Sequence, residues 1–520
     1  MPIRSTVFTQ ITAFLLLALL PTTTLYAQDA TPVFKAHTRI VILDIVVTDK
    51  KGNVVTDLKQ SDFNILEDKQ PQTIQTFEPP DAHNMPSSPD GKPIVTSTAD
   101  LSKIGNAPVT IIVLDELNTQ FMDMSFGRRS LAKYLMTQPA VLKQPTTLIS
   151  LGNTKFQLLQ DYTQNRDDLV KVLQAHFPEY PFKAYNPQSG TPLFNPYVNV
   201  DRIVQTMHAW MQIVKSSSGT PGRKNIIWVG ANPPMVKLGG IPDKDRKQWD
   251  QLTRNMSQAM LENRVTMYVI DPTIVGGASS GSDGLDYYGD VQVPKNPLTS
   301  YINWDHFATV TGGKIFAYRN DVGNEITTAI DNSAAYYTLS YSPTNKNEDE
   351  SKYRLIKIHL SNPDLTARTR EGYYLTPTNT TNVVNTPGLP DAQRQRLLRH
   401  DFTLTATSPL TFNGLAVSVQ KDPDKQNWLV TIGNKDISWT PQSNGDLQAE
   451  FTAVAVALNG KNKLLAQTAH EKISDHKADK PTPESIVFQM PTETPVGTTR
   501  IRFIVRDAVS GKIGTADVTP

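Results

Sequence analysis

Residues 108–114 read Pro-Val-Thr-Ile-Ile-Val-Leu and run directly into Asp115-Glu116-Leu117-Asn118-Thr119. A short apolar run rich in β-branched residues is typical of a buried parallel strand. The polar residues that follow would lie at the carboxyl end of that strand, which is the edge where open α/β sheets bind their ligands. An acidic residue with a hydroxyl four positions later can supply oxygen ligands to a hard cation such as Mg²⁺. The sequence therefore predicts an α/β fold with a binding site around Asp115 and Thr119.

From residue 108 onward, strand-like and helix-like runs alternate, which predicts a doubly wound, mostly parallel sheet with helices on both faces. Gly312-Gly313 is expected to end one of the helices and to permit a tight turn into the next strand. The strands are expected at residues 110–114, 147–151, 225–229, 266–270, 314–317, 336–341 and 353–360. The helices are expected at residues 126–136, 166–176, 200–214, 245–263, 304–311 and 324–332.

Flanking segments of different character predict further domains. An amino-terminal β unit is expected at 34–80, where residues 49–53 form a turn with Gly52 available for a positive φ. The α/β domain would span 107–375, and the Thr/Asn/Pro-rich segment that opens 376–399 indicates a linker. Short strand-like runs separated by turns in 400–520 predict a β-sandwich that resembles immunoglobulin or fibronectin type III modules, with a hairpin at 507–512.

The amino terminus and the composition point to an exported protein. Arg4 precedes the apolar run 11–20, which is too short to span a bilayer comfortably, and cleavage is expected after Ala27. The signal peptide would thus be 1–27; an uncleaved anchor is the alternative, and no later stretch is long and apolar enough to cross a membrane.

The chain has no cysteine, which fits a bacterial envelope, and we expect a periplasmic or secreted location. With 51 Lys and Arg against 50 Asp and Glu, charge gives no case for nucleic-acid binding.

Several segments, taken in order, resemble the bacterial VWFA-related domain family. The resemblance covers nearly the whole chain after residue 27 and implies a von Willebrand factor type A-like central domain between the two β modules. The matching segments are 47–52, 58, 62–63, 66–68, 115–119, 190–194, 222–227, 268–271, 311–316, 336–341, 370–374 and 502–514.

The same resemblance implies a metal-ion-dependent adhesion site, in a degenerate form. Asp115 and Thr119 match the first loop of that site and Thr191 the second, so these three are the implied ligands of Mg²⁺, Mn²⁺ or Ca²⁺. Leu117 stands where the motif has a serine, and Asn232 lies where the third loop should bring an aspartate. Fewer anionic ligands weaken the binding of a hard cation. In the alternative interpretation, Asp115 caps the next segment and Thr119 bonds the backbone in the turn.

The sequence thus predicts an exported, non-enzymatic module for protein binding, for adhesion or assembly. The predicted ligand-binding residues are Asp115, Thr119, Thr191 and Asn232, and the partner is an unidentified protein. A metal-free scaffold protein of the cell envelope is the alternative. A hydrolase would need Ser279, in a Gly-x-Ser-x-Gly pattern that lacks the strand–turn–helix context of a nucleophile elbow.

Overall fold

The computed structural model describes residues 40–88, 90–179, 196–231, 236–237, 243–273, 301–302, 304–317, 322–345, 352–374, 390–422, 427–477, 480 and 483–520. All of them belong to the unit Ile40–Pro520. The predicted signal segment, 1–27, lies outside the described residues.

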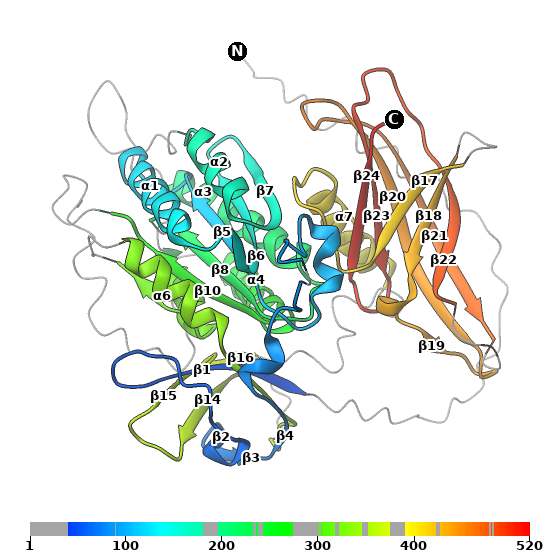
Figure 1. Ribbon diagram of the computed structural model, residues 1–520. Coiled ribbons are helices and arrows are strands. Elements are labelled where there is room, and N and C mark those ends of the chain that lie inside the picture. The colour runs from blue at the N-terminus through cyan, green and yellow to red at the C-terminus, as the bar shows by residue number, and fades with distance from the viewer. Residues whose placement is uncertain are drawn as a thin grey trace. The chain divides into compact units, whose positions relative to one another are not determined.

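This unit contains a six-stranded sheet, the central sheet, in the order β12-β10-β8-β5-β6-β7. Figure 1 labels its strands β5, β6, β7, β8 and β10. Five strands are parallel and the edge strand β7 is antiparallel to β6. When these strands are numbered along the chain, their order is 3-2-1-4-5-6, the order of the doubly wound α/β fold. The strands are β5 (Val109–Asp115), β6 (Val141–Leu151), β7 (Phe156–Asn165), β8 (Lys224–Val229), β10 (Val265–Ile270) and β12 (Ile315–Phe316).

Helices cover both faces of this sheet because alternate strand residues point to opposite sides. Ile112 and Leu114 join one core with α1, α2 and α6, whereas Ile111 and Val113 join another with α3, α4 and α5. The helices are α1 (Phe121–Thr137), α2 (Arg166–Ala175), α3 (Pro196–Ser216), α4 (Asp243–Glu262), α5 (Trp304–Val310) and α6 (Val322–Ala334). Gly312 has a φ of 81° just after α5, as the sequence predicted for this helix end.

Two four-stranded antiparallel sheets combine the amino-terminal strands with strands that follow α6. Their orders are β15-β1-β13-β4 and β16-β14-β2-β3. Contrary to the prediction from the sequence, the strands expected at 336–341 and 353–360 do not join the central sheet but pair with β1, β4 and β2. β13 is buried throughout, so its composition does not distinguish it from a strand of the central sheet. The strands are β1 (Val41–Thr48), β2 (Phe63–Glu67), β3 (Gln70–Gln72), β4 (Ile74–Glu78), β13 (Tyr337–Tyr341), β14 (Tyr353–Leu360), β15 (Thr366–Arg368) and β16 (Gly372–Tyr374).

The carboxyl-terminal region contains one helix and two further antiparallel sheets. The helix α7 (Asp391–Ala406) includes residues 391–399 of the predicted linker; its buried positions include Asp401 and Thr405, so it lacks an apolar period. One sheet has the order β17-β18-β22, and the other has the order β19-β20-β23-β24, with β21 also paired to β20. The strands are β17 (Val417–Lys421), β18 (Asn427–Gly433), β19 (Thr440–Pro441), β20 (Leu447–Leu458), β21 (Leu464–His476), β22 (Ser485–Pro491), β23 (Arg500–Asp507) and β24 (Ile513–Val518).

Short elements complete the described part of the chain. The strands β9 (Val236–Lys237) and β11 (Tyr301–Ile302) form a two-stranded antiparallel sheet. Two predicted turns are confirmed: Gly52 has a φ of 87°, and residues 507–512 connect β23 to β24. Short 3-10 helices occur at Gln60–Asp62, Pro80–His83, Thr98–Lys103 and Asn434–Asp436.

Within the residues that the structure describes, no helix has the length and apolar character needed to cross a membrane.

Candidate functional site

The candidate site lies where the strand order of the central sheet reverses. β5 and β8 are parallel neighbours, and the chain leaves β5 toward α1 and β8 toward α4. A doubly wound sheet binds its ligands outside the carboxyl ends of strands at such a reversal. Gly230, directly after β8, has a φ of 153°, and a Cβ there would lie 2.5 Å from Thr119 Oγ1 and 2.7 Å from Asp115 Cβ. A glycine is therefore required for these two loops to approach each other so closely.

Asp115 is fully buried, and its carboxylate is bonded by the protein itself. Asn118 donates to Oδ1 from its backbone N (3.1 Å), and its side-chain Nδ2 lies 3.0 Å from Oδ1 and 2.9 Å from Oδ2. The indole Nε1 of Trp228, on β8, donates to Oδ2 at 3.1 Å. An ionised carboxylate has about four acceptor positions. These contacts therefore hold Asp115 as a structural acceptor at the end of β5.

Burial nevertheless disfavours the ionised form of the Asp115 carboxylate. It raises the pKa of Asp115 to about 7, although Asn118, Trp228 and the nearby Arg202 guanidinium partly oppose the shift. Arg202, on α3, donates from Nε to Asn118 Oδ1 at 3.2 Å. Thr206, one turn further along α3, accepts from Asn118 Nδ2 at 3.1 Å. Asn118 thus links the loop after β5 to α3, and a cationic side chain lies beside it.

The loop after β5 is also fixed to its neighbours. Thr119 Oγ1 accepts a hydrogen bond from Ala231 N at 2.9 Å, so its oxygen already has a partner after β8. Leu117 is fully buried, and its backbone N donates to Leu151 O, at the end of β6, at 2.8 Å. The alternative interpretation, in which Thr119 bonds the backbone, agrees with this geometry.

The two implied metal ligands that the structure describes do not fit a divalent cation. N–H groups point their hydrogens at both oxygens of Asp115 and at Thr119 Oγ1, and a cation would have to displace these donors. Hard cations need several free oxygen ligands. In the described part of the chain, no group of three or more acidic or histidine side chains could hold a metal ion. Thr191 and Asn232, and also Ser279, lie outside the described residues.

A second buried network at the same edge was not found from the sequence. Glu116 is fully buried, bonds His176 Nε2 and accepts from Glu179 N at 2.9 Å. Glu179 in turn accepts from Thr154 N at 2.9 Å. No motif spacing reveals this network, because its members are tens of residues apart. Its result is a fixed segment after α2 in which Phe177, next to His176, is 71% exposed.

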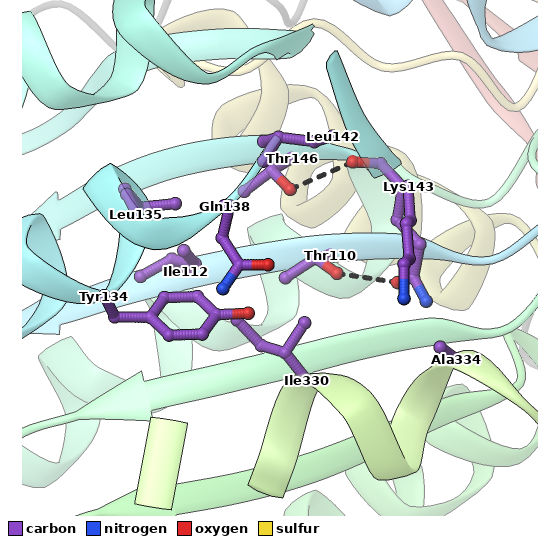
Figure 2. A pocket seen from close by; sticks show the side chains of 11 residues that line it. Thr110, Ile112, Tyr134, Leu135, Gln138, Leu142, Lys143, Thr146, Ile330 and Ala334 are labelled. Carbon is purple, nitrogen blue, oxygen red and sulfur yellow. Dashed lines mark hydrogen bonds between the residues drawn. The ribbon is translucent and has the colours of Figure 1, made fainter. Parts of the chain in front are cut away.

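A small cavity lies near the amino ends of β5 and β6, opposite the candidate site. It has a volume of about 40 Å³ and lies between β5, β6, α1 and α6 (Figure 2). Thr110 and Gln144 on its wall are bonded to each other, with Thr110 Oγ1 donating to Gln144 Oε1 at 2.8 Å. Thr110 is five residues before Asp115, which corresponds to about 16 Å along a strand. A cavity of this size holds a few water molecules, whereas ligand pockets measure roughly 300–1,000 Å³.

Comparisons with known proteins add little to this description. No family model matches the sequence. No curated protein matches it either. Among solved structures, the chain is similar to the crystal structure of the SpRpn10 VWA domain, with 12% identity and a TM-score of 0.21 over 42% of this chain and 93% of that one. A TM-score this low carries no argument about the fold, so the mixed α/β class rests on the strand order and the two cores of the central sheet.

Proposed function

We propose that this chain is an exported, non-enzymatic protein-binding module that uses the carboxyl edge of a von Willebrand type A-like sheet. We further propose that the edge works without a metal ion, and that the chain is related to bacterial VWFA-related proteins. The observation that carries the proposal is the position of the 115–119 loop at the strand-order reversal, where it is held by protein hydrogen bonds. Such an edge is rigid enough to present neighbouring side chains to a partner.

The aromatic side chains beside the loop support a protein partner. Phe177 is 71% exposed, and its ring lies 5.5 Å from that of Phe121, the first residue of α1. Aromatic residues are enriched in protein interfaces, where they supply contact area at low entropic cost. The network around Glu116 fixes the backbone on both sides of Phe177, so little ordering of this segment is needed when a partner binds.

Site-specific photo-crosslinking tests where the partner binds. A photoreactive phenylalanine analogue is placed at Phe177 in cells that produce the chain, and a matched one at Val487, which is 56% exposed on β22. We expect a discrete adduct with an envelope protein from position 177 and none from 487. Asn118→Ala should weaken the 177 adduct, because it removes the link between the loop and α3. An adduct from 487 alone would favour the scaffold alternative, and no adduct at 177 would reject the proposed edge.

Thermal unfolding tests the absence of a metal. A ligand that binds only the folded chain must raise its Tm. We expect the same Tm with EDTA and with Mg²⁺, Mn²⁺ or Ca²⁺, since N–H donors occupy the oxygens of Asp115. A rise in Tm that is lost in Asp115→Ala would restore the metal-dependent interpretation. The crosslinking experiment reports on protein binding independently, so metal binding at Asp115 and a failure to bind a protein can be told apart.

A further inference from the structure

The outward face of α1 carries an exposed stripe of two methionines and two basic residues. Met122, Arg129, Lys133 and Met136, here called the α1 stripe, are spaced by seven, four and three residues, which places them on one side of the helix. Met122 is 71% exposed and Met136 is 50% exposed. Arg129 and Lys133 are exposed between them. The stripe spans about 21 Å at the helical rise.

The opposite face of α1 already satisfies the needs of the fold. Met124, Leu131 and Leu135 are buried in the core that α1 shares with α2 and α6. The two methionines of the α1 stripe therefore contribute nothing to that core. Exposed methionines at both ends of one helix face suit a binding surface, because flexible, polarisable methionine side chains are over-used on surfaces that bind varied partners.

The charge of the α1 stripe is unbalanced. Arg129 and Lys133 form no ion pair with any acidic residue in the described part of the chain. Arg128, the third basic residue of α1, is turned inward, donating to Leu173 O at 2.6 Å. A partner that supplies carboxylates opposite the two exposed cations would gain complementary charge and avoid like-charge repulsion.

We propose that the α1 stripe binds an amphipathic segment of a partner protein, with acidic side chains in its middle and apolar side chains near both ends. The carboxylates would face Arg129 and Lys133, and the apolar side chains would cover Met122 and Met136. An anionic membrane is a weaker match, because two basic residues supply only about 1 kcal/mol each at a lipid surface. The stripe begins at Met122, next to Phe121, and runs along α1 to Met136, so its two cations lie beyond the loop at 115–119. The inference therefore goes beyond the proposed function and does not require it.

Peptide selection tests this proposal. A phage-displayed library of random 16-residue peptides is selected on the full-length chain and counter-selected on the Arg129→Glu/Lys133→Glu variant. We expect the enriched peptides to carry acidic residues between apolar ones. Their affinity should fall at least about tenfold for the double variant, since like charges would then face each other. The double variant Met122→Ala/Met136→Ala should also bind the same peptides with lower affinity. Lys357→Glu/Lys463→Glu, which reverses two exposed lysines elsewhere, is the charge-matched control and should bind as the wild type does.

Other outcomes would overturn the proposal. Enriched peptides that bind the Arg129→Glu/Lys133→Glu variant equally well, or that lack acidic residues, contradict it. Binding of phosphatidylglycerol vesicles that depends on Arg129 and Lys133, without peptide binding, would reassign the stripe to membranes. Asn118→Ala should leave peptide binding unchanged, so loss of the 177 crosslink and loss of peptide binding report on the two proposals separately.

Discussion

Among single residues, Lys224 is a buried base whose charge depends on pH near neutrality. It begins β8, and its ammonium donates to Thr220 O. Burial, together with the positive charge of Arg264, lowers the pKa of Lys224 to about 7 from its ordinary 10.5. Between these two pH values the unfolded chain binds the additional proton, so the contribution of Lys224 makes the free energy of unfolding rise with pH.

We therefore expect Lys224→Met to be more stable than the wild type near pH 6, with an advantage that shrinks as the pH rises toward 10. The methionine keeps an apolar stem but has no charge to bury. Urea unfolding at pH 6, 8 and 9.5 measures the difference. Lys357→Met, which makes the same substitution at an exposed position, is the matched control. A constant difference for Lys224→Met would show that the lysine keeps its proton in the folded chain.

For single residues, the sequence predicted where a site residue lies along the fold better than it predicted which residues it hydrogen-bonds. The strand ending at Asp115 and the hydroxyl of Thr119 beside it were expected, and the structure describes both at the carboxyl end of β5. Their partners could not be predicted: Trp228 is 113 positions from Asp115, and Arg202 is 84 positions from Asn118. A hydrogen bond between such distant residues leaves no period or spacing in a single sequence. Asp115 was interpreted as a metal ligand because the sequence does not reveal that N–H donors of Asn118 and Trp228 already bond both of its oxygens.

Among the elements, the β2–β3 hairpin has a turn that its sequence fits poorly. Glu67 pairs with Gln70, and the two residues between them, Asp68 and Lys69, have φ values of 48° and 70°. Two positive φ angles in a two-residue loop define a type I′ turn, which favours Asn-Gly or Asp-Gly. A lysine in this backbone region costs energy that a glycine does not.

We expect Lys69→Gly to raise the free energy of unfolding by up to about 1 kcal/mol, because it removes left-handed strain at the second turn position. The same substitution at Lys51, which is exposed in the 49–53 turn and has no positive φ, should lower stability by roughly 0.5 kcal/mol through the added freedom of the unfolded chain. Denaturant unfolding of the two variants measures the contrast. Destabilisation by both substitutions would contradict the turn assignment.

The ranges of most helices and strands could be predicted from the sequence, but the pairing of strands into sheets was harder to predict. The strand expected at 225–229 is β8 (Lys224–Val229), and the one at 353–360 is β14 (Tyr353–Leu360). β7 was missed because it is an edge strand with a half-buried, partly polar sequence. α7 was assigned to the linker because polar residues occupy most of its buried positions. Apolar runs identify buried strands, but they do not identify the sheet to which a strand belongs.

For the whole molecule, α7 is one of the segments that join the carboxyl-terminal sheets to the central one. Asp401 on α7 accepts from Lys215 Nζ, at the end of α3, at 2.7 Å and from Arg506 Nε, on β23, at 2.8 Å. Asp401 and Arg506 are buried. Burial alone would raise the pKa of Asp401, but Lys215 and Arg506 hold it below its ordinary value. One carboxylate thus connects three segments that are far apart in the sequence.

We expect Asp401→Asn to lower the free energy of unfolding by about 3–5 kcal/mol, because it leaves the buried Arg506 and the partly buried Lys215 without their carboxylate. Asp391→Asn, on the exposed side of the same helix, should change stability by less than about 1 kcal/mol.

Since the folded pKa of Asp401 is lowered, the stabilisation by its carboxylate is present near neutral pH and is lost as acid protonates it. The difference between wild type and Asp401→Asn should therefore be largest near pH 7 and shrink below the ordinary pKa of 3.8. Urea unfolding followed by tryptophan fluorescence at pH 7 and pH 3.5 measures both values. If the loss is as small as for Asp391→Asn, other contacts hold α7, such as the hydrogen bond from Arg502 to Thr405 O, and the ion cluster does not join the two regions.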